Sequence, residues 1–308
     1  MIELSVVIPT YNKKKTLQMT LQALNCQDYD FDKFEVIIVD DGSTDGTIKE
    51  IKNLIPKLKF KTSILSQTNQ GPASARNRGI KKARGKIVLI INNDTIATSD
   101  LVKRHFEFHQ KHPDEKFGLL GYVTWHPDLR VTPFMYWLEH GGPYFSFSEI
   151  KGRKAGWERF WTCNISLKKK FLLENGLLNE EFPYAAWEDI ELGYRLGKAG
   201  LQLLYDKHAV GYHYHPTTID SIKNKMKANG ESAMILKKKL PKNLLPPLAK
   251  FPRLAIILDT IFFFKPSFFL LEKIALWAET RINLGLIFDL LLLHWRIEGL
   301  REWYNISQ

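Results

Sequence analysis

Strands and helices alternate along the first part of this chain, and that order constrains the fold more than any other feature. Short runs rich in β-branched and aliphatic residues are expected to be strands, and each is followed by a stretch with helical spacing of apolar residues. The predicted strands are 5–9, 35–40, 62–65 and 87–92, and the predicted helices are 14–24, 45–54, 72–83 and 99–109. Such an order forms a mostly parallel sheet sandwiched by helices. We therefore predict an α/β fold.

After residue 117 the alternation is looser. Further strands are predicted at 118–124, 161–167 and 203–205, and a helix at 188–198. Residues 127–149 are rich in glycine, proline and aromatic residues, which predicts a long loop.

The composition changes at about residue 217. A basic helical stretch leads into apolar, phenylalanine-rich runs that charged residues and prolines interrupt. None of these runs reaches the roughly 18 apolar residues that a spanning helix needs. We expect a domain at 1–216 and a helical appendage at 217–308. The appendage either lies on an anionic membrane surface or packs as a cap on the first domain or another subunit.

The charge and the cysteines limit the partners and the compartment. The 308 residues carry a formal net charge of +11, which favours an anionic partner such as a nucleotide, a phosphate, an anionic lipid or a nucleic acid. The two cysteines, Cys26 and Cys163, have no metal-ligand spacing, so we expect neither a disulfide nor a zinc site. Together with an N-terminus unlike a signal peptide, this predicts a cytoplasmic protein.

The apolar run 87–91 ends abruptly at Asn92, Asn93 and Asp94. A continuous apolar run is typical of a strand buried on both faces, and ligands of α/β sheets bind at the carboxyl ends of such strands. Asp94 is therefore a candidate ligand for Mg²⁺ or Mn²⁺, although an aspartate that caps a turn would look the same.

No glycine-rich phosphate loop follows the first strand, where Pro9-Thr10-Tyr11-Asn12 stands instead. A bound diphosphate would then depend on a cation rather than on a helix N-terminus.

Two aspartates end the second predicted strand. Because successive strand residues point to opposite faces, Asp40 and Asp41 cannot both face one pocket. One is free to accept hydrogen bonds from a base or ribose, and the other binds backbone amides of the turn. A strand–turn–helix connection that needs only helix-capping residues and glycine would also explain these residues.

A glycine and two arginines mark the helix at 72–83. Gly71 precedes Pro72, which suits a first helical position. Arg76 is positioned to meet a phosphate one turn into the helix, whereas we interpret Arg78 as part of a solvated basic end.

Carboxylates and histidines recur near the end of the first domain. Glu188 and Asp189 begin a helix, where the macrodipole favours acids, and Trp187 beside them would shield a carboxylate and make it a better base. His213 and His215 would share one face of a strand and favour a ligand or metal role, and the spacing does not choose between them.

In this order, the motifs resemble those of the family 2 glycosyltransferases, which have the GT-A fold. The resemblance covers about residues 2–216 and is carried by residues 6–12, 35–47, 71–79, 92–94, 161–164, 187–196 and 210–213.

The resemblance implies a metal-dependent, inverting transfer of a sugar from a nucleotide-diphosphate donor to an acceptor hydroxyl. The residues that it assigns to nucleotide-sugar binding are Pro9, Thr10, Tyr11, Asp40, Gly71, Arg76, Asn92, Asn93 and Glu188. It assigns Mn²⁺ or Mg²⁺ to Asp94 and His213, and the catalytic base to Asp189. Asn92 stands where the family's Asp-X-Asp signature begins with aspartate, which removes one anionic contact.

This function implies a carbohydrate or lipid-linked acceptor in polysaccharide or glycolipid assembly. It also implies a location at the inner face of the plasma membrane, and no nucleic-acid partner is expected. Two alternatives are a sugar-phosphate nucleotidyltransferase, which would need a glycine-rich loop after the first strand, and a non-catalytic protein of the same fold that binds nucleotide or membrane.

Overall fold

The computed structural model describes residues 1–143 and 146–306 and divides into two compact units. The sheet unit consists of residues 1–128, 150–183 and 192–215, and the helical unit of residues 129–149, 184–191 and 216–308. Two short segments before residue 216 thus group with the C-terminal helices. Residues 144–145 of the predicted loop and residues 307–308 of the predicted appendage lie outside the described part of the chain.

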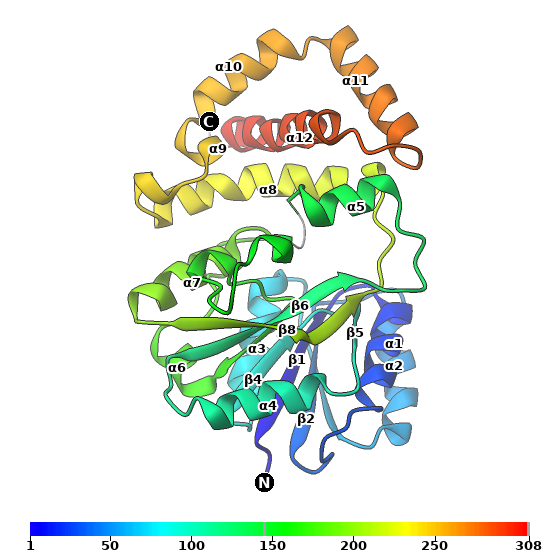
Figure 1. Cartoon of the computed structure of the whole chain (residues 1–308), viewed down its shortest axis with the longest axis vertical. Coiled ribbons are helices and arrows are strands. Elements are labelled where there is room, and N and C mark those ends of the chain that lie inside the picture. Colours follow the sequence, from blue (N-terminus) through cyan, green and yellow to red (C-terminus); the bar gives the residue numbers. More distant parts are fainter. Residues whose placement is uncertain (144–145, 307–308) are drawn as a thin grey trace. The chain divides into compact units, whose positions relative to one another are not determined.

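The sheet unit holds one eight-stranded sheet in the order β3-β2-β1-β4-β7-β6-β8-β5 (Figure 1). Its strands are β1 (Leu4–Thr10), β2 (Phe34–Asp40), β3 (Lys61–Ser66), β4 (Ile87–Ile91), β5 (Thr95–Ala97), β6 (Phe117–Trp125), β7 (Asn164–Lys168) and β8 (Gln202–His213). The first four strands are parallel to one another, as is β6 to β8, whereas β7 and β5 run antiparallel to their neighbours. The predicted α/β fold with a mostly parallel sheet is confirmed.

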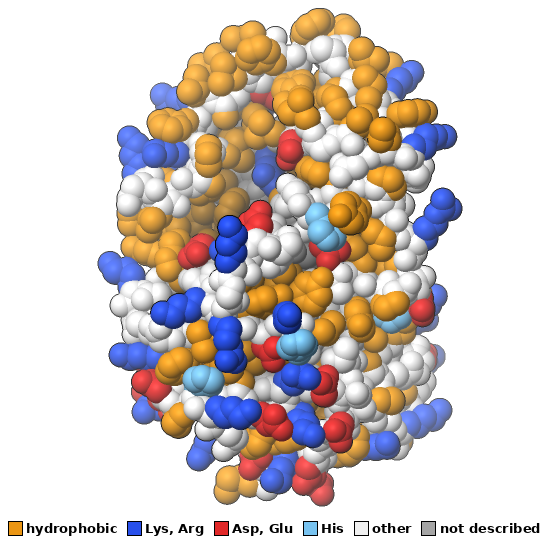
Figure 2. Space-filling view, in the orientation of Figure 1, with side chains coloured by type: hydrophobic (Ala, Val, Ile, Leu, Met, Phe, Trp, Pro, Cys, Tyr) orange, Lys and Arg blue, Asp and Glu red, His pale blue; other side chains and the backbone are white. Residues whose placement is uncertain are grey.

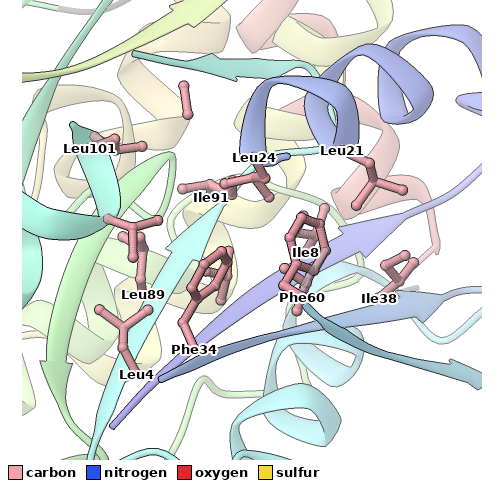
Figure 3. Close-up of a cluster of buried hydrophobic side chains, with 14 of the residues drawn as sticks. Leu4, Ile8, Leu21, Leu24, Phe34, Ile38, Phe60, Leu89, Ile91 and Leu101 are labelled. Atoms are coloured by element: carbon pink, nitrogen blue, oxygen red, sulfur yellow. The ribbon is translucent and has the colours of Figure 1, made fainter. Parts of the chain in front are cut away.

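Helices of this unit connect the strands. They are α1 (Lys14–Leu24), α2 (Thr47–Leu54), α3 (Pro72–Lys82), α4 (Leu101–Lys111) and α6 (Lys169–Glu174), with 3₁₀ turns at Ile55–Lys57 and Trp157–Arg159. Figure 3 shows the core on one face of the sheet, where Ile8, Ile38 and Ile91 lie near Leu21 and Leu24 of α1. Strands β1, β2 and β4 are buried on both faces, and this explains why their sequences are continuous apolar runs.

Two strands predicted for the second half of the sheet have the wrong bounds, and the strand β5 was not predicted. The strand predicted at 161–167 begins only at Asn164, and the one predicted at 203–205 is the much longer β8. The pairing of β8 with β6 shifts register between Gly121 and Tyr122. Polar residues of β8 at this irregularity interrupt the alternation of apolar and polar residues, so the sequence pattern predicts only a short strand. With only three residues, β5 is too short for any pattern.

The loop predicted at 127–149 contains helix α5 (Pro133–His140) and a 3₁₀ turn at Ser146–Glu149. The hydroxyl of Thr132 accepts a hydrogen bond of 3.2 Å from the amide of Met135 and caps α5. Pro133 occupies the first turn, where proline starts a helix rather than breaking one. The prediction of a loop, which rested on the content of glycine, proline and aromatic residues, is wrong for this stretch.

The helical unit also contains α8 (Ile219–Lys239), α9 (Pro247–Lys250), α10 (Pro252–Phe262), α11 (Lys265–Ala278) and α12 (Gly285–Ile306), with a 3₁₀ turn at Lys242–Leu244. Helices α8 and α12 approach closely through two glycines. A Cβ at Gly230 would lie 1.8 Å from the carbonyl oxygen of Arg296, and one at Gly299 would lie 1.9 Å from that of Lys227. Each glycine therefore receives the backbone of the other helix.

Helix α7 (Glu188–Lys198) has the predicted bounds, and its first turn groups with the helical unit. Within the described ranges, no single helix has the length and hydropathy to cross a membrane. Helix α10 and residues Pro266–Ala278 meet that criterion only as a pair, with a bend of 89° between them.

Candidate functional site

The carboxyl ends of β1, β2 and β4 bring the predicted polar residues to one edge of the sheet unit. Thr10 ends β1 directly beside Asp40, which ends β2, and both side chains are buried. Tyr11, the next residue, is exposed. Pro9 and Thr10 are also reached from β4, because the Asn93 amide donates to the carbonyl oxygen of Pro9 at 3.2 Å and to the hydroxyl of Thr10 at 3.4 Å.

Asn12 ties the segments after β1 and β2 together, a role that the sequence analysis missed. Its φ of 49° lies in the left-handed region, which asparagine tolerates better than most residues. Its side-chain oxygen accepts from the amides of Thr44 and Asp45 at 2.8 and 3.3 Å, and its own amide donates to the hydroxyl of Ser43 at 2.9 Å. The tendency of asparagine to adopt this conformation was the available signal.

The two aspartates after β2 have different surroundings. The carboxylate of Asp41 accepts from the amides of Gln70 and Gly71 at 2.8 and 2.9 Å, so it holds the turn before α3. Among residues 1–143 and 146–306, the carboxylate of Asp40 accepts only from the amide of Ser43, at 3.1 Å on Oδ1. Asp41 is therefore the structural partner, and Asp40 keeps one carboxylate oxygen for a ligand.

Gly71 and Arg76 have the local structure that the helix start requires. Gly71 has a φ of 89°, and a Cβ there would lie 2.9 Å from the carbonyl oxygen of Pro183. Arg76 lies one turn into α3 and is only 4% exposed. Arg78 donates to the carbonyl of Ser66 at the end of β3, at 2.7 Å, and so it has a structural contact rather than only a solvated one.

Asp94 and His213 meet where β5 pairs with β8. Thr95 lies opposite His213 in that pairing, and the carbonyl of Asp94 accepts from the amide of Tyr214 at 2.9 Å. Oδ1 of Asp94 lies 3.2 Å from Nδ1 of His213, and both side chains are buried. The expectation that His213 and His215 share a strand face is wrong, because β8 ends at His213.

The electrostatics of this pair suit a divalent cation. Burial alone would raise the pKa of Asp94, but the neighbouring His213, with smaller contributions from His215 and Lys13, lowers it to about 2. Asp94 is therefore a carboxylate near neutral pH. Its Oδ1 is buried beside the imidazole of His213 and has no other hydrogen-bond donor among the described residues. An oxygen and a nitrogen ligand so placed fit Mn²⁺ or Mg²⁺, which also bind substrate phosphates and water.

The described part of the chain holds no cluster of three histidine, cysteine, aspartate or glutamate side chains suited to a metal. Asn92 follows β4 and is half-buried beside Asn93.

A buried network, which the sequence analysis also missed, supports the end of β8. The amide of Asn164 donates at 2.9 Å to the carbonyl of Ala209, in the stretch of β8 that the register shift skips, and at 3.2 Å to that of Tyr122, the first residue of β6 after the shift. Its oxygen lies 3.0 Å from Nε2 of His105. Asn164 thus fixes the irregular stretch of β8 that leads to His213. No pattern in the sequence predicts these long-range bonds.

The predicted base lies in the helical unit, at the start of α7. Trp187 has a φ of 73°, a conformation that large side chains rarely adopt, and its indole donates to the carbonyl of Asn229 on α8 at 3.0 Å. Glu188 is buried, Asp189 is half-buried, and Oδ1 of Asp189 lies 2.8 Å from the amide of Ile190. The indole hydrogen bond therefore fixes the entry to the helix that carries both carboxylates.

The known proteins to which this chain is similar are glycosyltransferases. A model described as glycosyl transferase family 2 matches residues 5–121. An uncharacterized glycosyltransferase of Bacillus subtilis (strain 168) is 28% identical over 71% of this chain and 66% of its own length. Validoxylamine A glucosyltransferase of Streptomyces hygroscopicus subsp. jinggangensis is 29% identical over 68% and 54%. The chain thus spans about half to two thirds of the length of these relatives.

Among solved structures, a mannosyltransferase of Pyrobaculum calidifontis, in complex with GDP-Man and Mn²⁺, superposes with a TM-score of 0.64. It is 18% identical, and the match covers 99% of this chain and 88% of that one. At this identity, the similarity establishes a shared fold.

Proposed function

Because the chain belongs to glycosyl transferase family 2 and has the GT-A fold, we propose that it transfers a sugar from a nucleoside diphosphate to an acceptor hydroxyl. The observation that carries this proposal is the sheet edge where Thr10 and Asp40 end β1 and β2, and where Asp94 lies three residues beyond the end of the neighbouring parallel strand β4. Ligands of open α/β sheets bind at such an edge.

The nucleoside is bound at the ends of β1 and β2. The free oxygen of Asp40 accepts a hydrogen bond from the base or the ribose, and Thr10 lies directly beside it in the sheet register. The exposed ring of Tyr11 is available to pack against the base. The side-chain amide of Asn93 donates to the carbonyl of Pro9 at this edge, and Gly71 leaves room for the carbonyl oxygen of Pro183.

The diphosphate is bound with a divalent cation, Mn²⁺ or Mg²⁺, held by Asp94 and His213. When bound, such a cation neutralises the charge that develops on the departing diphosphate. Arg76 on α3 contributes a guanidinium to the same phosphates, and Asn92 leaves the site with one carboxylate fewer than an Asp-X-Asp sequence would give.

Asp189 is the general base, which takes the proton of the acceptor hydroxyl as the new glycosidic bond forms. Glu188 precedes it in the same helical turn and assists in donor binding. Direct attack by the acceptor inverts the anomeric configuration. The acceptor is a carbohydrate or a lipid-linked saccharide, and the reaction takes place in the cytoplasm during polysaccharide or glycolipid assembly.

Release of diphosphate from a panel of nucleotide sugars, with Mn²⁺, Mg²⁺ or a chelator, tests this proposal. One donor is expected to be turned over only in the presence of metal. Thermal shift with UDP, GDP, CDP and dTDP should show stabilisation by one of these nucleotides that depends on the metal.

A sugar-phosphate nucleotidyltransferase would instead release pyrophosphate from a nucleoside triphosphate. A non-catalytic protein would bind nucleotide without releasing any product.

A further inference from the structure

Helices α10 and α11, with the link between them, expose large apolar side chains. Six of the exposed apolar side chains here form a group that we call the apolar crest: Ile257, Ile261, Phe262, Phe264, Phe269 and Leu270. Figure 2 shows hydrophobic side chains gathered over these two helices. Exposed apolar surface that continues over two helices is typical of a binding surface.

The opposite face of the same helices is already packed. Asp259 of α10 is 3% exposed and lies between two side chains of α12, with 2.8 Å to Nδ1 of His294 and 2.8 Å to Nη2 of Arg301. Phe268 of α11 stacks on His294 with ring centroids 3.9 Å apart. These contacts fix which face of α10 and α11 is turned inward, so the face that carries the crest is the one available to a partner.

Every carboxylate of this region is on the inner side. Asp259, Glu272 and Glu279 are the acidic residues between positions 247 and 283, and all three are buried or half-buried. Glu272 lies 3.4 Å from Nζ of Lys223 on α8, and Glu279 accepts from the amide of Ile219 at 2.7 Å. Because these charges are occupied by protein groups, the outer face keeps only cations.

The cations lie beside the aromatic rings of the outer face. Nζ of Lys273 is 4.3 Å from the ring centre of Phe269, and Cζ of Arg281 is 5.6 Å from that of Trp277. Arg253 is exposed near the start of α10. Long cationic side chains that cover apolar groups while their charged ends stay in solvent are typical of a membrane interface.

The sign of this charge selects the partner. A second copy of the chain, docked through the same face by a two-fold axis, would bring these like-charged cations together. An anionic lipid surface offers hydrocarbon to the crest and phosphates to the cations, and thus complements both parts of the surface.

We propose that the apolar crest inserts into the acyl boundary of an anionic lipid leaflet, with Arg253, Lys273 and Arg281 on the headgroup phosphates. This interaction is independent of the transfer reaction, and it would bring the protein to the surface that carries a lipid-linked acceptor.

Flotation of the full chain with vesicles tests the proposal. Vesicles of phosphatidylcholine alone are compared with vesicles in which part of it is replaced by phosphatidylglycerol. Binding is expected only to the second kind. The double variant Phe262→Ser, Phe269→Ser should bind at least about 10-fold more weakly, because burial of each methylene contributes to affinity. Leu173→Ser removes an exposed apolar side chain of α6 and serves as the matched control.

The charge contribution is measured with Lys273→Gln, Arg281→Gln, which should lose roughly 10-fold in affinity for anionic vesicles at low salt. Lys52→Gln, Lys61→Gln removes two exposed lysines of the sheet unit and should bind as the wild type does. Lipids with brominated acyl chains should quench the fluorescence of the exposed Trp277, and the quenching should fall in Trp277→Phe.

Far-UV circular dichroism confirms that each variant is folded. Binding that is unchanged in the crest variant would overturn the proposal. So would a wild-type dimer in light scattering that the crest variant dissociates while neither protein floats with vesicles, because the surface would then belong to a second copy.

Discussion

Nδ1 of His213 lies 3.2 Å from Oδ1 of Asp94, a contact between the last residue of β8 and the residue that precedes β5. The short pairing of β5 with β8 makes this contact, and it places an imidazole next to a carboxylate that follows the buried strand β4. The proposed cation site therefore depends on the sheet register as well as on the two side chains.

Asp94→Ala is expected to abolish the metal dependence of nucleotide binding, because it removes the anionic ligand at the end of β4. The thermal shift that a nucleoside diphosphate produces with Mn²⁺ should fall to the value measured with chelator. Asp28→Ala, which removes an exposed carboxylate beside Lys103, should leave the Mn²⁺ response intact. A Mn²⁺ response in Asp94→Ala equal to that of the wild type would exclude Asp94 as a ligand.

Asp189→Asn is expected to reduce turnover by about 10²- to 10⁴-fold, the usual contribution of a general base. The substitution keeps the size of the side chain, so the affinity for nucleotide, measured by calorimetry, should change little. Asp220→Asn is the matched control, since Asp220 also lies in a first helical turn, on α8, and is exposed. Equal turnover in Asp189→Asn and the wild type would remove Asp189 from this role.

The residues at strand ends could be predicted from the sequence better than the side chains and amides that contact them. Asp94 was predicted because a buried parallel strand has a continuous apolar sequence that ends abruptly. Its contact with His213 was suggested only by the family resemblance, since a three-residue strand such as β5 leaves no periodicity. The choice between Asp40 and Asp41 likewise needed the structure, because it depends on amides of residues 70 and 71, which are far along the chain.

The backbone conformation at Trp187 is a second feature that could not be predicted from the sequence. Nothing in the sequence around Trp187 indicates a positive φ, because a large side chain is disfavoured there and adopts it only when tertiary contacts compensate. The bond from the indole to the carbonyl of Asn229 is such a contact.

Trp187→Phe tests that bond. An aromatic ring is kept while the donor is lost, so the carbonyl of Asn229 keeps its place in α8 but loses the indole donor, and stability should fall by about 0.5 to 1.5 kcal/mol. Urea unfolding followed by circular dichroism measures the change. Asn229→Ala is the control, because it leaves the accepting carbonyl in place and should cost less. The bond would be unimportant if both variants unfolded at the wild-type urea concentration.

Two buried histidines predict a loss of stability in mild acid. Burial lowers the pKa of His105 to about 4 and, together with the nearby Lys168 charge, that of His109 to about 3. Both are hydrogen-bonded to Ser166, at 2.7 Å from Nδ1 of His105 and 2.9 Å from Nε2 of His109, which suits neutral rings. Below about pH 6.5 the unfolded chain binds protons that these rings do not, so unfolding becomes more favourable as the pH falls toward 4.

The free energy of unfolding should therefore be greatest above about pH 7 and should decrease between pH 6.5 and 4, by up to about 1.4 kcal/mol per pH unit for each of the two histidines. Urea unfolding at several pH values measures this slope. His105→Gln should be less stable at pH 7.5, because the contacts to Ser166 and Asn164 are disturbed, but its slope should be shallower by the contribution of one histidine. His208→Gln, at an exposed position of β8, should keep the wild-type slope. A slope that is the same in His105→Gln and in the wild type would show that His105 is already protonated in the folded protein, and the network that supports the end of β8 would then have to include an imidazolium.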